Sequence, residues 1–230
     1  MKKVGVLVLV LASSCYLWAG SDKEDATERL QKAGDVLHEI MGTPDKGIPS
    51  EVIQGAKCIA VVPKMIKGGF VFGAKHGKGV ATCRTAKGWS APAFFTVSGG
   101  SWGLQIGVEG VDLVMMIMND KGMQDLLSSK FQIGAQASAS AGPVGRHASA
   151  GTDWKLDTEI LTYSRSKGLF AGISLEGSWI EQDKDSTVAV YGKKDDSYRA
   201  ALTGKLATPP EAVPFLKAVG FTEEQAKKAA

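Results

Sequence analysis

The stretch that most constrains the fold is residues 160–175, in which two β-type runs flank a single glycine. Alternate residues of the first run fall on opposite faces of one strand: Ile160, Thr162 and Ser164 on one face, and Leu161, Tyr163 and Arg165 on the other. Gly168 permits a tight reversal into the second run, residues 169–175. The stretch therefore predicts a β-hairpin, with Arg165 and Lys167 beside its turn.

A segment of small residues and a turn precede this hairpin. Residues 134–141 alternate with period two, but their side chains are too small to build a hydrophobic core by themselves. They suit a strand on which another element packs closely. In the next five residues Pro143 fixes φ, and Gly142 and Gly145 allow positive φ. We therefore expect the chain to turn sharply there and to hold Arg146 at the turn.

These strings closely resemble the signature of the SYLF domain family. The matching segments stand in one order, at residues 88–92, 104–107, 142–146 and 163–178, and the resemblance covers roughly residues 26–192. It implies a lipid-binding domain: eukaryotic relatives bind phosphoinositides and act in membrane remodelling and actin organisation, whereas bacterial relatives are exported. Fold-level likeness does not transfer a ligand, so the residues must also be interpreted on their own.

The residues that belong to the matching motifs are interpreted as structural. They are Gly142, Pro143, Gly145, Arg146, Tyr163, Ser164, Arg165 and Gly168. We expect the two arginines to hold turns by pairing with Asp153, Glu159 or Glu176.

Charge is segregated along the chain, although the formal net charge is only +3. Residues 52–108 contain seven basic residues and no acid, whereas residues 20–51 contain eight acids and four bases. A region of one sign is typical of a surface that meets an anionic partner. The other interpretation is that alternate lysines only keep sheet edges soluble. We predict that the region binds anionic membrane lipids through Lys64, Lys67, Lys75, Lys78, Arg84 and Lys87.

Residues 1–21 have the pattern of a secretory signal peptide. Two lysines are followed by an apolar run over residues 4–12 and by small residues at 19–21. The run is too short to span a bilayer as a permanent helix. We therefore expect an exported protein, periplasmic, envelope-associated or secreted. Residues 11–15 also resemble a lipobox, in which Cys15 would be lipidated, so cleavage near residues 19–21 and a lipid anchor both stay open.

The rest of the pattern predicts an α+β fold on a strongly twisted antiparallel sheet, with a barrel-like form as one option. An amphipathic helix is expected from Asp25 to the residues before Gly42. Its polar face is mostly acidic, which disfavours docking on an anionic membrane, so we expect this helix to cover the sheet. Residues 58–62 indicate a buried strand. Residues 75–78 are predicted to form one hairpin tip, and Gly99 with Gly100 to join the strands of another.

Three segments divide the chain in this interpretation. Residues 1–21 form the signal peptide, residues 22–193 the SYLF-like domain, and residues 194–230 a small helical tail beyond the resemblance. A capping box at Thr222 would open the last helix of the tail.

Two cysteines, Cys58 and Cys83, lie on neighbouring predicted strands. In an oxidising compartment they would form a disulfide if their Cα atoms come within about 7 Å; the alternative is a pair of buried thiols. Their spacing does not suggest zinc, and His38, His76 and His147 are isolated. We expect no metal and no cofactor.

Other chemistry is disfavoured by context. A serine hydrolase is the least favoured alternative. Residues 99–103 match the G-x-S-x-G string of such enzymes around Ser101, with Asp112 and His147 following, but that motif needs a helix after the serine and a strand-like segment follows instead. Residues 73–79 lack the P-loop order, so no nucleotide is expected, nor a nucleic acid. The prediction is a non-enzymatic lipid-binding domain. The alternative is an envelope structural or protein-interaction protein, anchored through Cys15.

Overall fold

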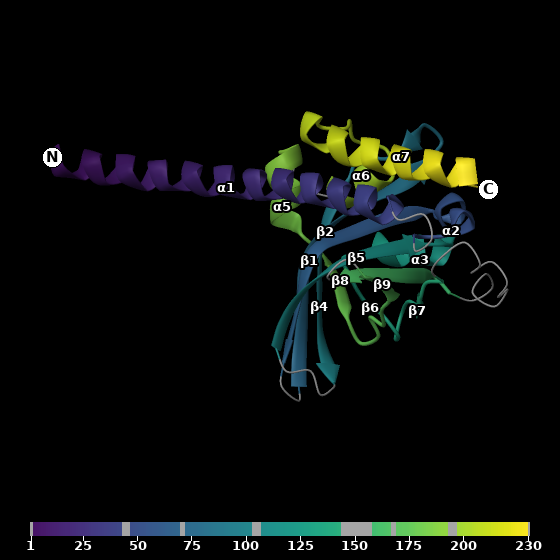
Figure 1. The fold of residues 1–230 in the computed structure, drawn as a ribbon. Helices are drawn as coiled ribbons and strands as arrows, with labels where there is room; N and C mark the ends of the chain where they lie inside the picture. The colour runs from purple at the N-terminus through teal and green to yellow at the C-terminus, as the bar shows by residue number, and fades with distance from the viewer. Residues whose placement is uncertain are drawn as a thin grey trace.

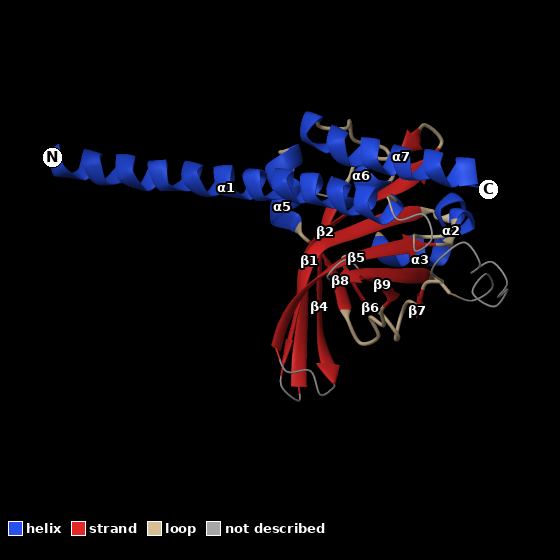
Figure 2. Ribbon diagram, viewed as in Figure 1, coloured by secondary structure: helices blue, strands red, loops and turns tan. Residues whose placement is uncertain are grey.

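The computed structural model describes residues 2–42, 47–69, 72–102, 107–143, 158–166, 169–192 and 197–229 (Figure 1). Its helices are α1 (Lys2–Met41), α2 (Ser50–Gly55), α3 (Asp120–Leu126), α5 (Lys184–Tyr191), α6 (Ser197–Leu202) and α7 (Val213–Ala229), the last preceded by the 3₁₀ turn η2 (Pro210–Ala212). Its strands are β1 (Cys58–Gly69), β2 (Phe72–Thr85), β3 (Gly88–Trp89), β4 (Ala93–Trp102), β5 (Gly107–Ile117), β6 (Lys130–Gln132), β7 (Ala139–Ala141), β8 (Ile160–Ser166), β9 (Leu169–Gly172) and β10 (Trp179–Gln182). The predicted α+β class is confirmed (Figure 2).

The strands form one strongly curled sheet. Its main path runs β6-β10-β4-β2-β1-β5-β8-β7, with β3 paired to β2 and β9 to β8. Among the described strand pairs, only β7 with β8 is parallel. Residues 133–138 alone separate the outer strands β6 and β7, a span of about 25 Å at most. The edges of the sheet therefore lie close together, which gives the barrel-like curl.

The curl gives the sheet an inner and an outer face, each with its own core. In β1, Cys58, Ala60 and Val62 belong to the inner core, whereas Ile59 and Val61 belong to the outer core. The inner core also receives side chains from α3 and α6, and the outer core from α1, α2 and α7. Since both faces of residues 58–62 are fully buried, the strand predicted from their apolar run is confirmed.

Helix α1 is longer than the sequence pattern predicted, at 40 residues. The apolar face expected for its second half is buried in the outer core: Ala26, Leu30, Ala33, Leu37 and Ile40. This half lies beside α7, whereas the first half extends past the sheet and the other helices (Figure 1). Of the helices in the described ranges, none is long and apolar enough to cross a membrane.

The C-terminal segment is helical, as expected, and it packs into the domain instead of forming an appendix. Phe215, Ala218 and Val219 of α7 are fully buried in the outer core. The predicted capping box is wrong, because α7 continues through Thr222 without a break. The Thr222 hydroxyl donates to the Ala218 carbonyl, 2.8 Å away, as threonine can within a helix.

The hairpin predicted from residues 160–175 is confirmed. β8 pairs antiparallel with β9, from Ser166 opposite Leu169 to Tyr163 opposite Gly172. Lys167 and Gly168, the predicted turn, lie outside the described residues. The small-residue segment supplies β7, which lies along the other edge of β8.

The two other predicted hairpins are wrong, because continuous strands occupy those positions. β2 passes straight through residues 75–78, and β4 passes through Gly99 and Gly100. The glycines of β2 serve close packing instead of turns: a Cβ on Gly79 would lie 2.5 Å from Phe95 Cζ. The chain reverses beyond Gly69, several residues before the predicted tip.

β1, β2, β4 and β5 continue beyond the helices as a projection (Figure 1). The register places Gly69 opposite both Gly73 of β2 and Gly107 of β5, and Phe72 opposite Trp102 of β4. We call this part the projecting end, and it comprises residues 64–69, 72–78, 98–102 and 107–111. Its described residues contribute none of the outer core, so the outer helices pack on it at most near residue 78.

The packing of Gly79 can be tested by substitution. Gly79→Ala should lower the free energy of unfolding by about 1 to 3 kcal/mol, because the added methyl group meets Phe95 and the Val61 carbonyl. Gly100→Ala on β4 is the matched control, since the nearest atom to its Cβ is 4.0 Å away. Urea unfolding followed by tryptophan fluorescence measures both. Equal stability of the two variants would contradict the packing role.

Candidate functional site

The six predicted basic residues do not form one surface. Lys64, Lys67, Lys75 and Lys78 lie on the projecting end, whereas Arg84 and Lys87 lie at the opposite end of β2. Glu109 is the only carboxylate in the same described ranges of the projecting end. This end therefore holds four of the six predicted residues, and its described ranges contain more lysines than carboxylates.

Lys64 marks a bulge in β1. Its φ is +53°, and the pairing of β1 with both neighbouring strands shifts register around it. The Lys64 amide donates to Asp112 Oδ1 of β5 at 2.9 Å, which stabilises the bulge. The side chain is exposed, so its charge is available to a partner.

Lys67 and Lys75 lie directly opposite each other on β1 and β2. Strand alternation places both on the inner face, with Met65 and Ala81 of the inner core. Lys75 is only 7% exposed, and its Nζ donates to the Ser174 carbonyl at 3.4 Å. Burial, followed by the positive charge of Lys67, lowers the pKa of Lys75.

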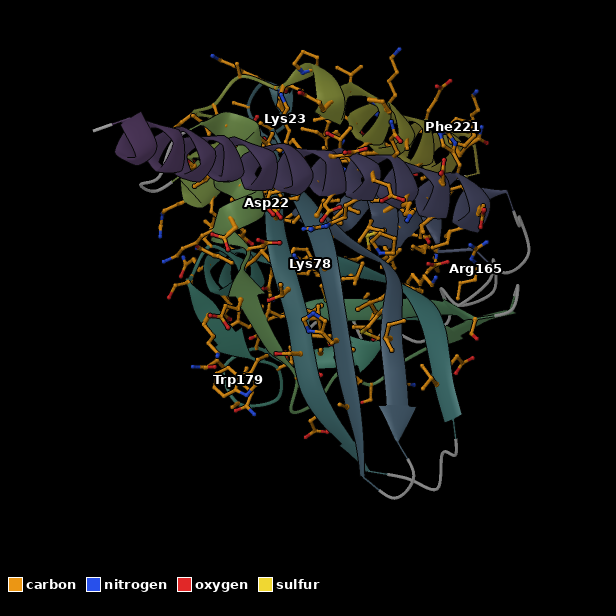
Figure 3. All side chains as sticks on the ribbon, turned by 90° about the vertical axis from the view of Figure 1, so that its left-hand side faces the viewer. Asp22, Lys23, Lys78, Arg165, Trp179 and Phe221 are labelled. Carbon is orange, nitrogen blue, oxygen red and sulfur yellow. A yellow bond between two sulfur atoms is a disulfide. The ribbon has the colours of Figure 1, made fainter. Side chains whose placement is uncertain are left out.

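Lys78 lies on the outer face, under α1 (Figure 3). Its Nζ is 3.7 Å from Asp183 Oδ2, but its side chain is still 53% exposed. Asp183 is buried and also accepts from Arg29 of α1 at 3.0 Å and from the Ser186 amide of α5 at 3.1 Å. Burial opposes ionisation of Asp183, but these donors outweigh it and lower its pKa. The cluster thereby links α1, α5 and the sheet.

Arg84 has a structural role. It donates to the carbonyls of Ile53 and Ala56 and to Glu223 Oε1 of α7, and its guanidinium lies over the Trp89 ring. These contacts fix α2 and α7 to the sheet and leave Arg84 little freedom to meet a ligand. Lys87 is exposed in the turn between β2 and β3, far along the strand from the projecting end.

Two aliphatic side chains are exposed on the outer face of the projecting end. Ile66 is 41% exposed and Val108 is 79% exposed. Val108 lies opposite Gly68 on β1, two residues along from Ile66, so the side chains of Ile66 and Val108 are diagonal neighbours on one face. Exposed aliphatic side chains beside lysines are a combination that suits a membrane interface, where apolar and charged groups are both accommodated.

Where the structure describes the motif residues, they are packed against neighbouring elements. A Cβ on Gly142 would lie 2.2 Å from Tyr163 Cζ, so the Tyr163 ring requires a glycine there. Pro143 follows Gly142, and Ser164 is buried on β8. Gly145, Arg146 and Gly168 lie outside the described residues.

The expected partners of Arg165 were wrong. Arg165 donates to Asp112 at 2.8 Å and contacts Glu39 of α1, so it joins β8 to β5 and to the helix (Figure 3). Glu159 pairs instead with Lys121 of α3, at 2.7 Å. Asp112 and Glu39 are distant in sequence from Arg165, and no local pattern could have identified them. Arg146 and Asp153 lie outside the described residues.

The two cysteines form a disulfide bond. Cys58 of β1 lies opposite Cys83 of β2, and their Sγ atoms are 2.07 Å apart. The bond lies in the inner core, at the end of the sheet opposite the lysines. The side chain of Cys15, the candidate lipidation site, is outside the described residues, although its backbone belongs to α1.

No catalytic or metal-binding arrangement is found in the described residues. Ser101 lies within β4, paired with Gly73, and the next described element is strand β5, so the helix of a nucleophile elbow does not follow. The part of the chain that the structure describes holds no group of three metal-binding side chains. His38 packs on Phe221, with ring centroids 4.8 Å apart, and His147 is outside the described residues.

Comparisons with known proteins agree with the motif pattern. The profile of the family Ysc84, described as "Las17-binding protein actin regulator", matches residues 98–220. SH3 domain-containing YSC84-like protein 1 of Xenopus laevis is 33% identical over 202 residues, which are 84% of this chain and 60% of that protein. Protein YSC84 of Saccharomyces cerevisiae is 34% identical over 197 residues, 81% of this chain and 42% of that protein.

A second yeast relative extends the same picture. LAS seventeen-binding protein 3 is 32% identical over 184 residues, 78% of this chain and 39% of that protein. The chain therefore spans 60% or less of the length of these relatives. The family match ends within α7, so it includes most of the C-terminal segment that the sequence pattern placed outside the resemblance.

The Glu223 cluster predicts a pH dependence of stability. Burial opposes ionisation of Glu223, but hydrogen bonds from Arg84, Trp89 and Lys227 hold its pKa at about 2. A carboxyl group whose pKa is lower in the folded protein than in the unfolded chain stabilises the fold at pH values above the unfolded pKa. This stabilisation is lost as the pH falls towards 2, the pKa in the folded protein. Wild type should therefore lose up to about 3 kcal/mol from this group between pH 4.5 and 2.

Urea unfolding across that pH range measures the effect. Glu223→Gln should be less stable than wild type at pH 7, and its stability should change less on acidification. Glu224→Gln is the control, because Glu224 is exposed on the same helix and pairs only with Lys228 among the described residues. An acid profile of Glu223→Gln that parallels wild type would contradict this assignment.

Proposed function

We propose, because the chain belongs to the Ysc84 (SYLF) family, that this protein is a non-enzymatic domain that attaches to anionic phospholipid or phosphoinositide surfaces by its projecting end. One observation carries the proposal: this end brings together four lysines against a single carboxylate in its described residues and carries exposed Ile66 and Val108. A cationic surface with apolar side chains is what an anionic membrane interface recognises.

The energetics limit the proposal to reversible attachment. Each basic residue close to an anionic surface contributes about 1 kcal/mol, so Lys64 and Lys67 together contribute about 2 kcal/mol. Lys75 is buried, and Lys78 lies under α1 beside Asp183. Arg84 and Lys87 are left out, because they lie at the other end of the sheet. The attraction falls within a Debye length, about 8 Å at physiological ionic strength. Attachment should therefore weaken strongly with salt.

The charge of α1 defines the orientation. Its exposed face carries acids, including Asp22, Glu28 and Asp35, and an anionic membrane would repel them. The projecting end extends away from this helix (Figure 1). An approach by the projecting end therefore brings the lysines to the lipid and keeps the acidic helix away.

A protein partner is the second candidate function. The matching family is described as "Las17-binding protein actin regulator", and one relative is named LAS seventeen-binding protein 3. This chain would then bind an envelope protein through the same cationic end, which also suits an acidic protein surface.

We further propose that the protein is exported through residues 1–21. The pattern of two lysines and an apolar run supports this, and so does the Cys58–Cys83 disulfide, because disulfides persist in oxidising compartments. Mass spectrometry of the protein from its native host should find a mature N-terminus near residues 19–21, or a lipidated Cys15. An intact chain beginning at Met1 would contradict export by cleavage.

Co-sedimentation with liposomes tests the attachment. The protein should bind vesicles that contain anionic lipid, release at high salt and ignore neutral vesicles. The double variant Lys64→Gln/Lys67→Gln should partition about 30-fold more weakly, which corresponds to the loss of about 2 kcal/mol.

The control has the same change in charge at a distance from the projecting end. Lys87→Gln/Lys217→Gln should bind as wild type does. If both double variants lose binding equally, net charge and not the projecting end is responsible. If the wild type binds no vesicle, the lipid proposal fails and the search turns to an envelope protein partner.

A further inference from the structure

An unusual row of residues crosses the inner face of the projecting end. Glu109 of β5 lies opposite Lys67 of β1, Lys67 opposite Lys75 of β2, and Lys75 opposite Gly99 of β4. Lys75 is more than nine-tenths buried, and burying an ammonium group is costly unless an anion or several hydrogen bonds compensate it. Among the described residues, its one hydrogen bond is the long contact with Ser174.

The charged groups around Lys75 do not compensate it. The nearest member of the row is Lys67, which repels it and is only half-buried. The row ends at Glu109, whose carboxylate accepts a hydrogen bond from the Ser166 hydroxyl of β8. His76 lies on the opposite face of β2. Lys67 and Lys75 are therefore neighbouring cations, and Lys75 is the buried one.

A buried polar group without a partner among the described residues lies at the other end of the row. Ser178 is fully buried, and its Oγ has no hydrogen-bond partner among the described residues. It covers the inner side of Gly99, where a Cβ would lie only 2.9 Å from Ser178 Oγ. Gly99 is the residue opposite Lys75, so Lys75 and Ser178 lie on either side of Gly99 on one face of the sheet. The ammonium has only its long hydrogen bond to the Ser174 carbonyl, and the hydroxyl has no partner among the described residues.

We infer that Lys75, Lys67 and Ser178 form a binding site for a phosphate group on the inner face of the projecting end. An oxyanion with several acceptor oxygens satisfies both the buried ammonium and the unpartnered hydroxyl, and charge-assisted hydrogen bonds of this kind are strong. Lys67, which lies opposite Lys75 and is only half-buried, supplies the second positive charge. The ligand is a phosphate monoester or free phosphate; as a lipid headgroup it would give the attachment proposed above its selectivity among anionic lipids.

Titration in the absence of membranes tests the site. The probes are inorganic phosphate and dioctanoyl phosphatidic acid below its micelle concentration, with chloride at matched ionic strength as the comparison. Protein labelled with ¹³C-lysine reports the Lys75 Cε resonance, which Lys75→Met identifies by its loss. Phosphate should shift this resonance saturably and raise the Lys75 pKa, because a bound anion favours the charged form.

Variants separate the site from general screening. Ser178→Ala and Lys67→Gln should each weaken phosphate binding by roughly tenfold, the size expected for one hydrogen bond to a charged group. Lys87→Gln should leave it unchanged. Saturation with phosphate alone assigns a soluble ligand, and saturation with the lipid assigns a headgroup; either supports the site.

Two results would overturn the inference. One is a Lys75 resonance that neither probe shifts; the other is a shift that chloride reproduces, since Lys75 would then be a buried amine without a ligand. Because the titration uses no vesicles, its failure is distinct from failure of the attachment. A protein that sediments with anionic vesicles but ignores phosphate refutes only the interior site.

Discussion

The rest of the structure depends on the burial of β1 on both faces. Its first half, residues 58–62, supplies one core inside the curl of the sheet and another beneath the helices. A strand in this position must be apolar at every residue, and it must have long neighbours on both sides. β2 and β5 meet that requirement, and both continue with β1 past the helices. The projecting end is therefore a consequence of strand length, held in place by the cores at the other end.

Charge is distributed along the same axis. Where the helices cover the sheet, charged groups are paired: Arg29 with Asp183, Arg84 with Glu223, and Arg165 with Asp112. Breaking such a pair would leave an uncompensated charge in a partly dry environment. On the projecting end the lysines outnumber the carboxylates. Ion pairs therefore stabilise the helix-covered part of the sheet, and the proposed attachment uses the lysines at its other end.

The sequence pattern predicted those features that depend only on residues close together in the chain. The β8–β9 hairpin, the buried strand at residues 58–62 and the apolar face of α1 follow from side-chain alternation and periodicity, and all three were found. The glycines led to two wrong predictions, a hairpin tip at residues 75–78 and a junction between strands at Gly99 and Gly100. In a curled sheet a glycine can make room for a neighbour such as Phe95, and the sequence of β2 alone does not distinguish this role from a turn.

The candidate site was only partly predictable for a related reason. The run of lysines without acids identified the right strands, but it could not separate Arg84, which is held by Glu223 in a helix 139 residues away. Nor could it show that Lys75 points inward or that Ser178 lies on the same face, across Gly99. Those facts depend on register between strands that are distant in sequence. The family match places the chain in a family without assigning these residues a role, and the chain spans 60% or less of the length of these relatives.

Depth measurement on a membrane tests the central claim most directly. A spin label at Val108, on the projecting end, and another at Lys87, at the opposite end, would be compared on anionic vesicles by their collisions with oxygen and with a water-soluble nickel complex. The account predicts that the Val108 label becomes more accessible to oxygen and is shielded from nickel, whereas the Lys87 label does not change. Shielding of Lys87 with Val108 left in water would contradict it.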